Sequence, residues 1–185
     1  MQDMFKVAVL IGSARQGRVA DRVMKWLMPE LRRFPDFVYH VLDAREFETG
    51  DKADPTYEAV IRNADAVIVV TPEYNHSFPA PLKAMIDALG EPWHRKPVAF
   101  VSYGGISGGL RAVEQLRLVF AELSMVTVRE TVSISNPWSV LSSDGVPTNA
   151  DYLAAAVVRM MGSLLWWTRA LKKARAETEK KEMAA

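Results

Sequence analysis

The stretch that most constrains the fold is residues 5–20, FKVAVLIGSARQGRVA. It opens with a continuous apolar run that ends at Ile11, as in a central parallel strand covered on both faces. A small, basic loop follows, and an amphipathic helical pattern begins at Val19. This arrangement predicts an anion site, because backbone N–H groups and the helix dipole favour negative charge at a helix N-terminus. Three side chains add donors to the loop: Ser13, Arg15 and Arg18.

The loop differs from the common nucleotide-binding motifs. Gly12 and Gly17 have the G-x4-G spacing of a P-loop, but Arg18 and Val19 stand where Lys and Ser or Thr would be needed. The G-x-G-x-x-G pattern of a dinucleotide fold is absent as well. A phospho-receiver would need acidic residues where the chain has Gly12 and Ser13. A compact phosphate cradle is the favoured hypothesis, and a plain strand–helix turn with incidental arginines is the alternative.

Composition excludes several classes of protein. The 185 residues suit one domain, residues 1–185, and 23 basic against 22 acidic residues give no electrostatic reason to expect a nucleic-acid partner. With no cysteine the chain has no disulfide or thiolate site, and its three histidines lack the spacing of metal ligands. The N-terminus does not resemble a signal peptide, and residues 160–168 are too short an apolar run to span a bilayer. We expect a cytoplasmic protein with no membrane or metal partner.

Strand and helix patterns alternate along the whole chain, which predicts a doubly wound α/β domain with a parallel sheet. The predicted strands are residues 5–11, 37–42, 65–71, 97–103 and 125–134. The predicted helices are residues 19–33, 56–63, 79–89, 108–123 and 149–174. Polar loops are expected at 48–55 and 135–149, and a frayed, charged tail at 176–185.

Three unusual loops follow the first, third and fourth predicted strands: GSARQGR, TPEYNHSFP and SYGGISGG. In sheets of this kind ligands bind beyond the carboxyl ends of the strands, so all three loops are expected at one site. Aromatic and hydrogen-bonding side chains in the second loop suit a flat heteroaromatic ligand with polar edges. Four glycines in the third allow backbone amides to face such a ligand. His76 could act as a proton donor, although a hydrogen-bonding role is the favoured interpretation.

Together these loops resemble the NAD(P)H-dependent FMN reductases of flavodoxin-like fold, a family that includes quinone, azo and chromate reductases. The matching segments are residues 12–18, 72–87 and 93–109, and the resemblance covers about residues 7–136. It implies a doubly wound, five-stranded parallel sheet of order 2-1-3-4-5 with helices on both faces. It also implies that the bound cofactor is FMN and that NADPH or NADH is the reductant.

The resemblance assigns cofactor-binding roles to three groups of residues. The phosphate would be held by Ser13, Arg15, Gly17 and Arg18 with backbone amides of the same loop. The isoalloxazine ring would be lined by Pro72, Glu73, Tyr74, Asn75, His76 and Ser77 on one side, and by Tyr103, Gly104 and Gly105 on the other. Many relatives have Ser or Asn where this chain has Arg18 and Val19, so Arg18 either adds a phosphate contact or faces solvent. No side chain need act as a nucleophile, because the flavin carries the chemistry.

By the same resemblance the protein is an oxidoreductase that works by ping-pong hydride transfer through flavin N5 to a small acceptor. The acceptor would be a flavin, a quinone, an azo compound or a metal oxyanion. A homodimer or homotetramer is expected, with helices 79–89 and 108–123 as candidate contacts and Trp138 either reaching a neighbour or packing locally. The alternatives are a flavodoxin-type electron carrier, disfavoured by the balanced charge, and a flavin-binding redox sensor without turnover. Four arginines are candidates for recognising NADPH: Arg15, Arg18, Arg95 and Arg111.

Overall fold

The structure is a computed structural model that describes residues 4–47 and 54–183. Most of the polar loop predicted at residues 48–55 therefore lies outside the described residues, as do residues 184 and 185 of the predicted tail. No helix in the described part of the chain is long and apolar enough to cross a membrane.

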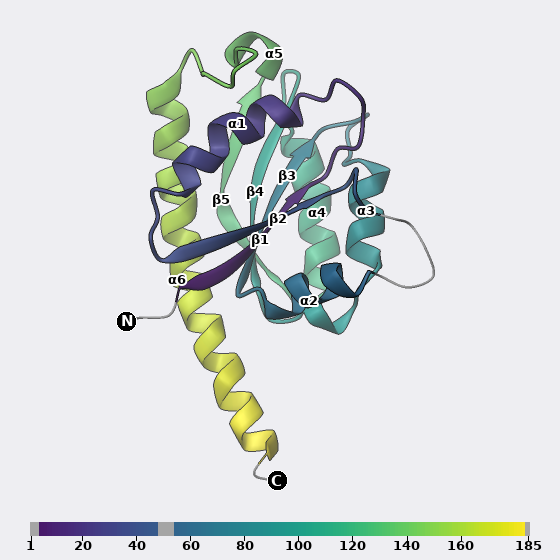
Figure 1. The fold of residues 1–185 in the computed structure, drawn as a ribbon, viewed down its shortest axis with the longest axis vertical. Coiled ribbons are helices and arrows are strands. Elements are labelled where there is room, and N and C mark those ends of the chain that lie inside the picture. The colour runs from purple at the N-terminus through teal and green to yellow at the C-terminus, as the bar shows by residue number, and fades with distance from the viewer. Residues whose placement is uncertain (1–3, 48–53, 184–185) are drawn as a thin grey trace.

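Five parallel strands form one sheet in the order β2-β1-β3-β4-β5, which confirms the predicted topology (Figure 1). The strands are β1 (Phe5–Ile11), β2 (Phe37–Asp43), β3 (Ala66–Pro72), β4 (Pro97–Gly104) and β5 (Val126–Ser135). Each begins and ends within a residue or two of the predicted bounds, because each is set by an apolar run between polar or glycine-rich loops.

Helices cover both faces of the sheet. Helices α1 (Ala20–Leu31) and α6 (Ala150–Met183) pack on one face, and α2 (Pro55–Asn63), α3 (Ala80–Asp87) and α4 (Leu110–Glu122) on the other (Figure 1). Successive strand side chains point to opposite faces, so in β1 Val7 and Val9 enter the first core while Ala8 and Leu10 enter the second. The continuous apolar strand runs follow from this double burial.

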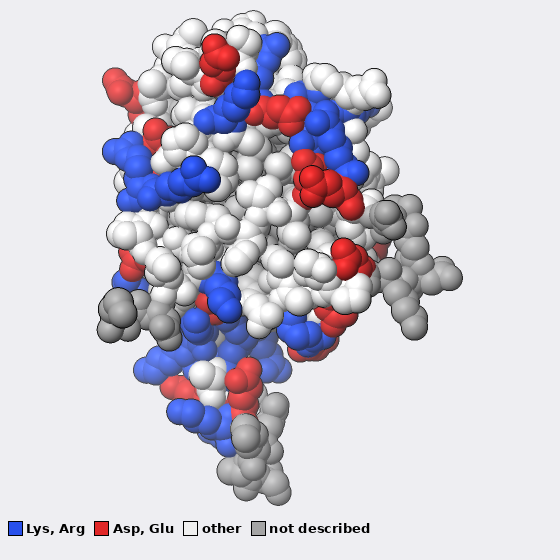
Figure 2. All heavy atoms as spheres, viewed as in Figure 1, with Lys and Arg blue, Asp and Glu red and all other residues white. Residues whose placement is uncertain are grey.

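The structure differs from the prediction after β5. The loop predicted at residues 135–149 contains a short helix, α5 (Pro137–Val140). Elsewhere in the chain, a 3₁₀ turn, η1 (Glu91–Trp93), precedes β4. The helix end predicted near Ala174 is wrong: α6 continues to Met183, so residues 176–183 are helical rather than frayed. The segment after Gly162 contains no proline or further glycine and is rich in Ala, Lys and Glu, which favour helix. Figure 1 shows this end of α6 projecting beyond the body, and Figure 2 shows Lys and Arg side chains gathered there with acidic side chains among them.

Two buried ionisable groups lie at the amino edge of the sheet. Asp65 accepts bonds from Lys172 Nζ at 2.9 Å and Arg175 Nη2 at 3.4 Å, which fasten α6 to the start of β3. Lys96 Nζ donates to the carbonyl oxygens of Ile61 (2.6 Å) and Arg62 (2.9 Å) at the end of α2. Only 5% of Lys96 is exposed, and burial lowers its pKa to about 8.

We expect the stability of the protein to rise between pH 8 and 10 because of Lys96. Its folded pKa of about 8 lies below the unfolded value of roughly 10.4, so in this range the unfolded chain binds more protons. The free energy of unfolding should gain on the order of 3 kcal/mol across the whole window. Urea unfolding from pH 7 to 10 should show this gain in the wild type and in the exposed control Lys83→Met, but not in Lys96→Met. Parallel profiles for all three proteins would contradict the assignment.

Candidate functional site

The three unusual loops meet at the carboxyl edge of the sheet, as their positions after β1, β3 and β4 predict. The amide of Gly12 donates to the carbonyl of Val70 at 2.9 Å, and the amide of Glu73 donates to the carbonyl of Tyr103 at 2.9 Å. The amide of Asn136 donates to Gly104 at 2.7 Å and brings in the segment after β5. Backbone bonds between neighbouring strand ends therefore fix the loops relative to one another.

A cavity of about 350 Å³ opens between these loops. Nine predicted site residues line it: Arg15, Gly17, Arg18, Pro72, Glu73, Tyr74, Tyr103, Gly104 and Gly105. Four lining residues were absent from the predicted site: Gln16, Val19, Pro137 and Trp138. Gln16 belongs to the predicted phosphate loop and Val19 begins the helix predicted after it, so both could have been included. The other two lie on α5, which the sequence did not predict, and Trp138 is 55% exposed beside the cavity.

The hairpin turn after Tyr74 lies outside the cavity lining. Tyr74 and Ser77 form a two-residue turn whose central residues, Asn75 and His76, have φ of 51° and 66° and are exposed. Ser77 Oγ donates to Gln115 at 2.5 Å, and Gln115 Nε2 donates to the His76 carbonyl at 2.9 Å. The structure thus places these three predicted ring contacts at the rim of the site.

Arg18 neither faces solvent nor points freely into the cavity. Its side chain is 4% exposed, and its guanidinium forms a two-bond ion pair with Asp43, a 2.8 Å bond to Asp21 and a bond to the Ser13 carbonyl. Burial alone would raise the pKa of Asp43, but the bonds from Arg18 outweigh it and hold that pKa below its usual value. The same pairing with Asp43 raises the pKa of Arg18. Arg18 therefore braces the loop from within.

Asp43 accepts a bond from the Arg45 amide at 2.9 Å, but its main partner is Arg18. The sheet order contained a signal for this pair, because Asp43 ends β2 directly beside Ile11 at the end of β1.

Arg15 and Ser13 meet at Tyr74. The Arg15 guanidinium lies 3.7 Å from the centre of the Tyr74 ring, within range of a cation–π contact. Beneath it, the buried Ser13 Oγ lies 2.8 Å from the Tyr74 hydroxyl. Val19, which precedes α1 and lines the cavity, makes no side-chain capping bond, so the first amides of the helix have no side-chain partner from this residue. An exposed cation and a helix N-terminus thus lie together at the cavity.

Glu73 ties the hairpin loop to the glycine-rich loop. Its carboxylate accepts from Ser107 Oγ (2.5 Å), the Arg111 amide (3.2 Å) and Arg111 Nη1 (2.9 Å). Burial would raise the pKa of Glu73, but these three bonds outweigh it and lower that pKa. Gly109 is needed at the same junction, because its φ is 87° and a Cβ there would lie 2.7 Å from the Tyr103 amide nitrogen.

The buried Tyr103 hydroxyl is the polar side-chain atom that lacks a hydrogen-bond partner within the described residues. Burial, with Tyr74 nearby, raises the pKa of Tyr103, so this hydroxyl stays protonated. An unpaired buried donor costs free energy unless a ligand or water satisfies it. In the loop after Tyr103, a Cβ on Gly105 would meet no atom within 4 Å. The donors, the aromatic face and the glycine backbone fit a flat, anionic ligand such as FMN.

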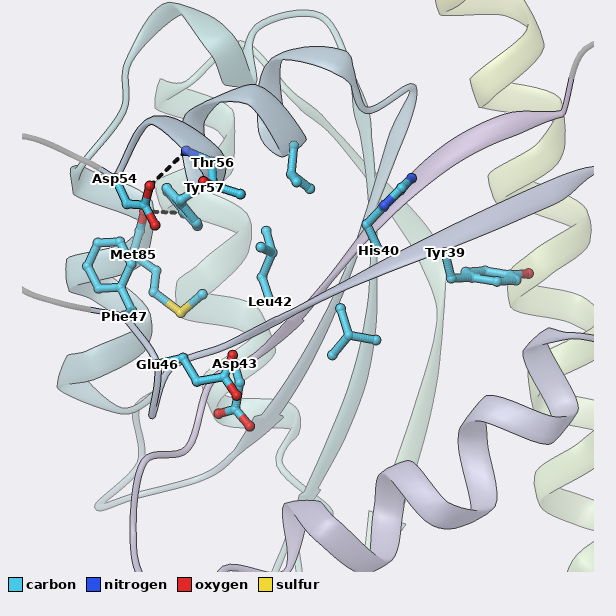
Figure 3. A pocket seen from close by; sticks show the side chains of 12 residues that line it. Tyr39, His40, Leu42, Asp43, Glu46, Phe47, Asp54, Thr56, Tyr57 and Met85 are labelled. Carbon is cyan, nitrogen blue, oxygen red and sulfur yellow. Dashed lines mark hydrogen bonds between the residues drawn. The ribbon is translucent and has the colours of Figure 1, made fainter.

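A larger hollow of about 680 Å³ lies beside β2 and is also lined by residues of α2 and by Met85 of α3. Figure 3 shows Phe47, Tyr57 and Met85 around it, with Asp54 bonded to the amide of Thr56. Three acids line this hollow, and no Lys or Arg is among the described residues that do so. Asp43 is already paired with Arg18, but Glu46 and Asp54 would repel a phosphate, so the smaller cavity is the better candidate for a phosphorylated cofactor.

The sequence also matches a known family model. The model, described as NADPH-dependent FMN reductase, matches residues 5–139. The chain belongs to this family. The match includes all three loops of the site, and an FMN-dependent, NAD(P)H-linked oxidoreductase activity follows from membership.

Named relatives agree with this membership. An NAD(P)H-dependent FMN reductase from Schizosaccharomyces pombe is 30% identical over 136 residues, which cover 65% of this chain and 68% of the relative. A quinone reductase from Escherichia coli is 31% identical over 144 residues, which cover 70% and 77%. Among solved structures, a flavoenzyme NAD(P)H:(acceptor) oxidoreductase from Paracoccus denitrificans has the same fold, with a TM-score of 0.73, 22% identity and coverage of 90% and 98%.

We expect Asp43→Asn to destabilise this FMN reductase by about 2 kcal/mol at pH 7, because it leaves the buried Arg18 unpaired. FMN affinity should fall about tenfold, since the phosphate loop loses its brace. Because the pKa of Asp43 is lowered in the folded protein, the ionised carboxylate contributes fully to the free energy of unfolding above its unfolded pKa of ~3.9. This contribution is lost as the pH falls through the folded pKa. Urea unfolding at pH 7 and at successively lower pH tests the stability, and quenching of flavin fluorescence tests the affinity.

The matched control is Asp87→Asn, which removes an exposed i,i+4 ion pair with Lys83. It should change stability by no more than about 0.5 kcal/mol. Equal losses in the two variants would show that the Arg18–Asp43 pair has no special role.

Proposed function

We propose that the protein binds FMN in the 350 Å³ cavity, with the phosphate at the loop of residues 12–18 and the ring between Tyr74 and the Gly104–Gly105 backbone. The observation that carries this proposal is the meeting of an exposed arginine, an uncapped helix N-terminus and a glycine-lined wall in one cavity. Arg15 and the loop amides would bind the phosphate, while Arg18 holds the loop in shape. Bound FMN supplies hydride and electron transfer between the nicotinamide and the acceptor.

The remaining predicted residues take narrower roles in this proposal. Ser13 would orient Tyr74 through their shared hydrogen bond. Asn75, His76 and Ser77 would contact the outer edge of the ring from the exposed turn, and no proton transfer is assigned to His76. Glu73 would hold the turn and the glycine-rich loop at a fixed separation. The protein's contribution is then to position the reactants and keep the ring's inner face from water.

We propose a ping-pong reaction with a quinone or free flavin as acceptor. The open mouth of the cavity supports a small acceptor that replaces the nicotinamide on the same face of the ring. The names of the relatives, quinone reductase and FMN reductase, support these two acceptor classes over azo compounds and metal oxyanions. An electron carrier or a sensor would bind FMN without steady turnover of NADPH.

Two of the four candidate arginines remain for NADPH recognition. Arg95 precedes β4, at the amino edge of the sheet away from the cavity, and Arg18 is held in its ion pairs. Arg15 and Arg111 lie near the cavity, and because Arg15 is assigned to the FMN phosphate, we propose that the half-exposed Arg111, beside Glu73, binds the 2′-phosphate. A cytoplasmic location and the lack of a nucleic-acid partner stay predictions from the sequence.

A homodimer or homotetramer is proposed, with α3 and α4 as contacts. Exposed apolar side chains near the cavity support this, namely Ile106 (87%), Leu110 (46%) and Trp138 (55%). A second subunit that covers these side chains would bring Trp138 against its surface at the site.

The proposed reaction is tested by adding NADPH to the FMN-loaded protein without oxygen. We expect the flavin absorbance to bleach within seconds and to return on addition of benzoquinone, with parallel double-reciprocal plots for the two substrates. Flavin that stays oxidised with NADPH but is reduced by dithionite would indicate a carrier or sensor instead.

The position of the ring is tested at Gly105. We expect Gly105→Leu to raise the Kd for FMN by about a hundredfold, because the new side chain would extend into the space assigned to the ring. The protein should fold normally, since a Cβ at this position meets nothing within 4 Å. Quenching of flavin fluorescence measures the affinity, and Gly105→Ala, which adds one methyl group, serves as the control with a change of less than about threefold. An unchanged affinity in the leucine variant would remove Gly105 from the site.

A further inference from the structure

Helix α6 carries an apolar stripe on the side that faces away from the sheet. Its buried residues, such as Val157 and Leu164, pack into the core. On the opposite side Val158 is 54% exposed and Trp166 is 63% exposed, with Gly162 between them and nothing near its missing Cβ. Large apolar side chains aligned on one exposed helix face indicate a contact surface.

The exposed residues on the two sides of Gly162 are complementary in size and charge. Counted outward from this glycine, Val158 corresponds to Trp166, Ala155 to Arg169 and Asp151 to Lys173. A contact between two identical surfaces requires each residue of a pair to face the other member in the second copy. Antiparallel packing of α6 on itself, with the two glycines at the crossing point, meets this requirement.

Charge favours the antiparallel arrangement over a parallel one. Antiparallel packing places Lys173 opposite Asp151 of the second copy, and Arg169 opposite the small side chain of Ala155. Parallel packing would instead place Lys173 against Lys173 and Arg159 against Arg159, which is destabilising. In the antiparallel register Arg159 faces Leu165, so no cation lies directly opposite another.

We propose that α6 is a two-fold docking surface for a second copy of this chain, with Trp166 packing on Val158 of that copy. The contact would run from residue 151 to residue 173, a helix length of roughly 33 Å. This surface is separate from α3 and α4, which pack on the other face of the sheet. With a second two-fold contact through α3 and α4, it would complete a tetramer.

The absence of cysteine from the sequence allows a direct test of the crossing point. We expect Gly162→Cys to form a covalent dimer under mild oxidation or with a short bis-maleimide, because the two-fold axis would bring the residue against its own copy. The control is Ala176→Cys, which is exposed on the same helix but far from the crossing point. The yield of covalent dimer should be at least tenfold lower in the control, and equal low yields would overturn the proposal.

A second test measures the oligomer without covalent chemistry. By light scattering, Trp166→Glu should halve the mass of the wild-type assembly, while the exposed-loop control Val146→Glu should leave it unchanged. An unchanged mass of the assembly in Trp166→Glu would overturn the proposal. It would also be overturned by a wild-type protein that does not self-associate and instead binds anionic vesicles through Trp166. Neither readout needs flavin or turnover, so a failure here is distinct from a failure of the proposed function.

Discussion

The ion pair between Arg18 and Asp43 is the interaction on which the candidate site depends. It joins the loop after β1 to the end of β2 and holds the Ser13 carbonyl through the same guanidinium. The pair is largely buried, so losing one partner would leave a charge without compensation. The loop amides at the start of α1 therefore keep a fixed direction without any ligand. Preorganisation of this kind lowers the ordering cost of binding an anion.

Two arginines in one short loop consequently have different tasks. Arg18 is enclosed and structural, whereas Arg15 rests on Tyr74 at the surface and can move toward a ligand. A similar division applies across the cavity. Glu73 is occupied in bonds that join two loops, while the glycine backbone beside it is open. In the proposed binding mode these charged side chains shape the site, and backbone groups with Arg15 are left to contact the cofactor.

The sequence was sufficient to predict the sheet order and the three loops of the site, because buried parallel strands and glycine-rich or basic loops have strong local signals. It was not sufficient to predict the partner of Arg18, since that bond joins residues far apart in the chain and depends on the lateral order of β2 and β1. The place of Asn75 and His76 at the rim follows from a tight turn with positive φ at both residues, which composition alone did not reveal. Trp138 reaches the cavity through α5, whose four residues are too few for a periodic pattern.

FMN is proposed to bind at the carboxyl edge of β1, β3 and β4, and not in the larger acidic hollow beside β2. Amide chemical-shift mapping during an FMN titration of the ¹⁵N-labelled protein tests it most directly. We predict that the largest shifts fall in residues 12–18 and 103–105. Shifts concentrated instead around Leu42, Tyr57 and Met85, which line the other hollow, would contradict the account.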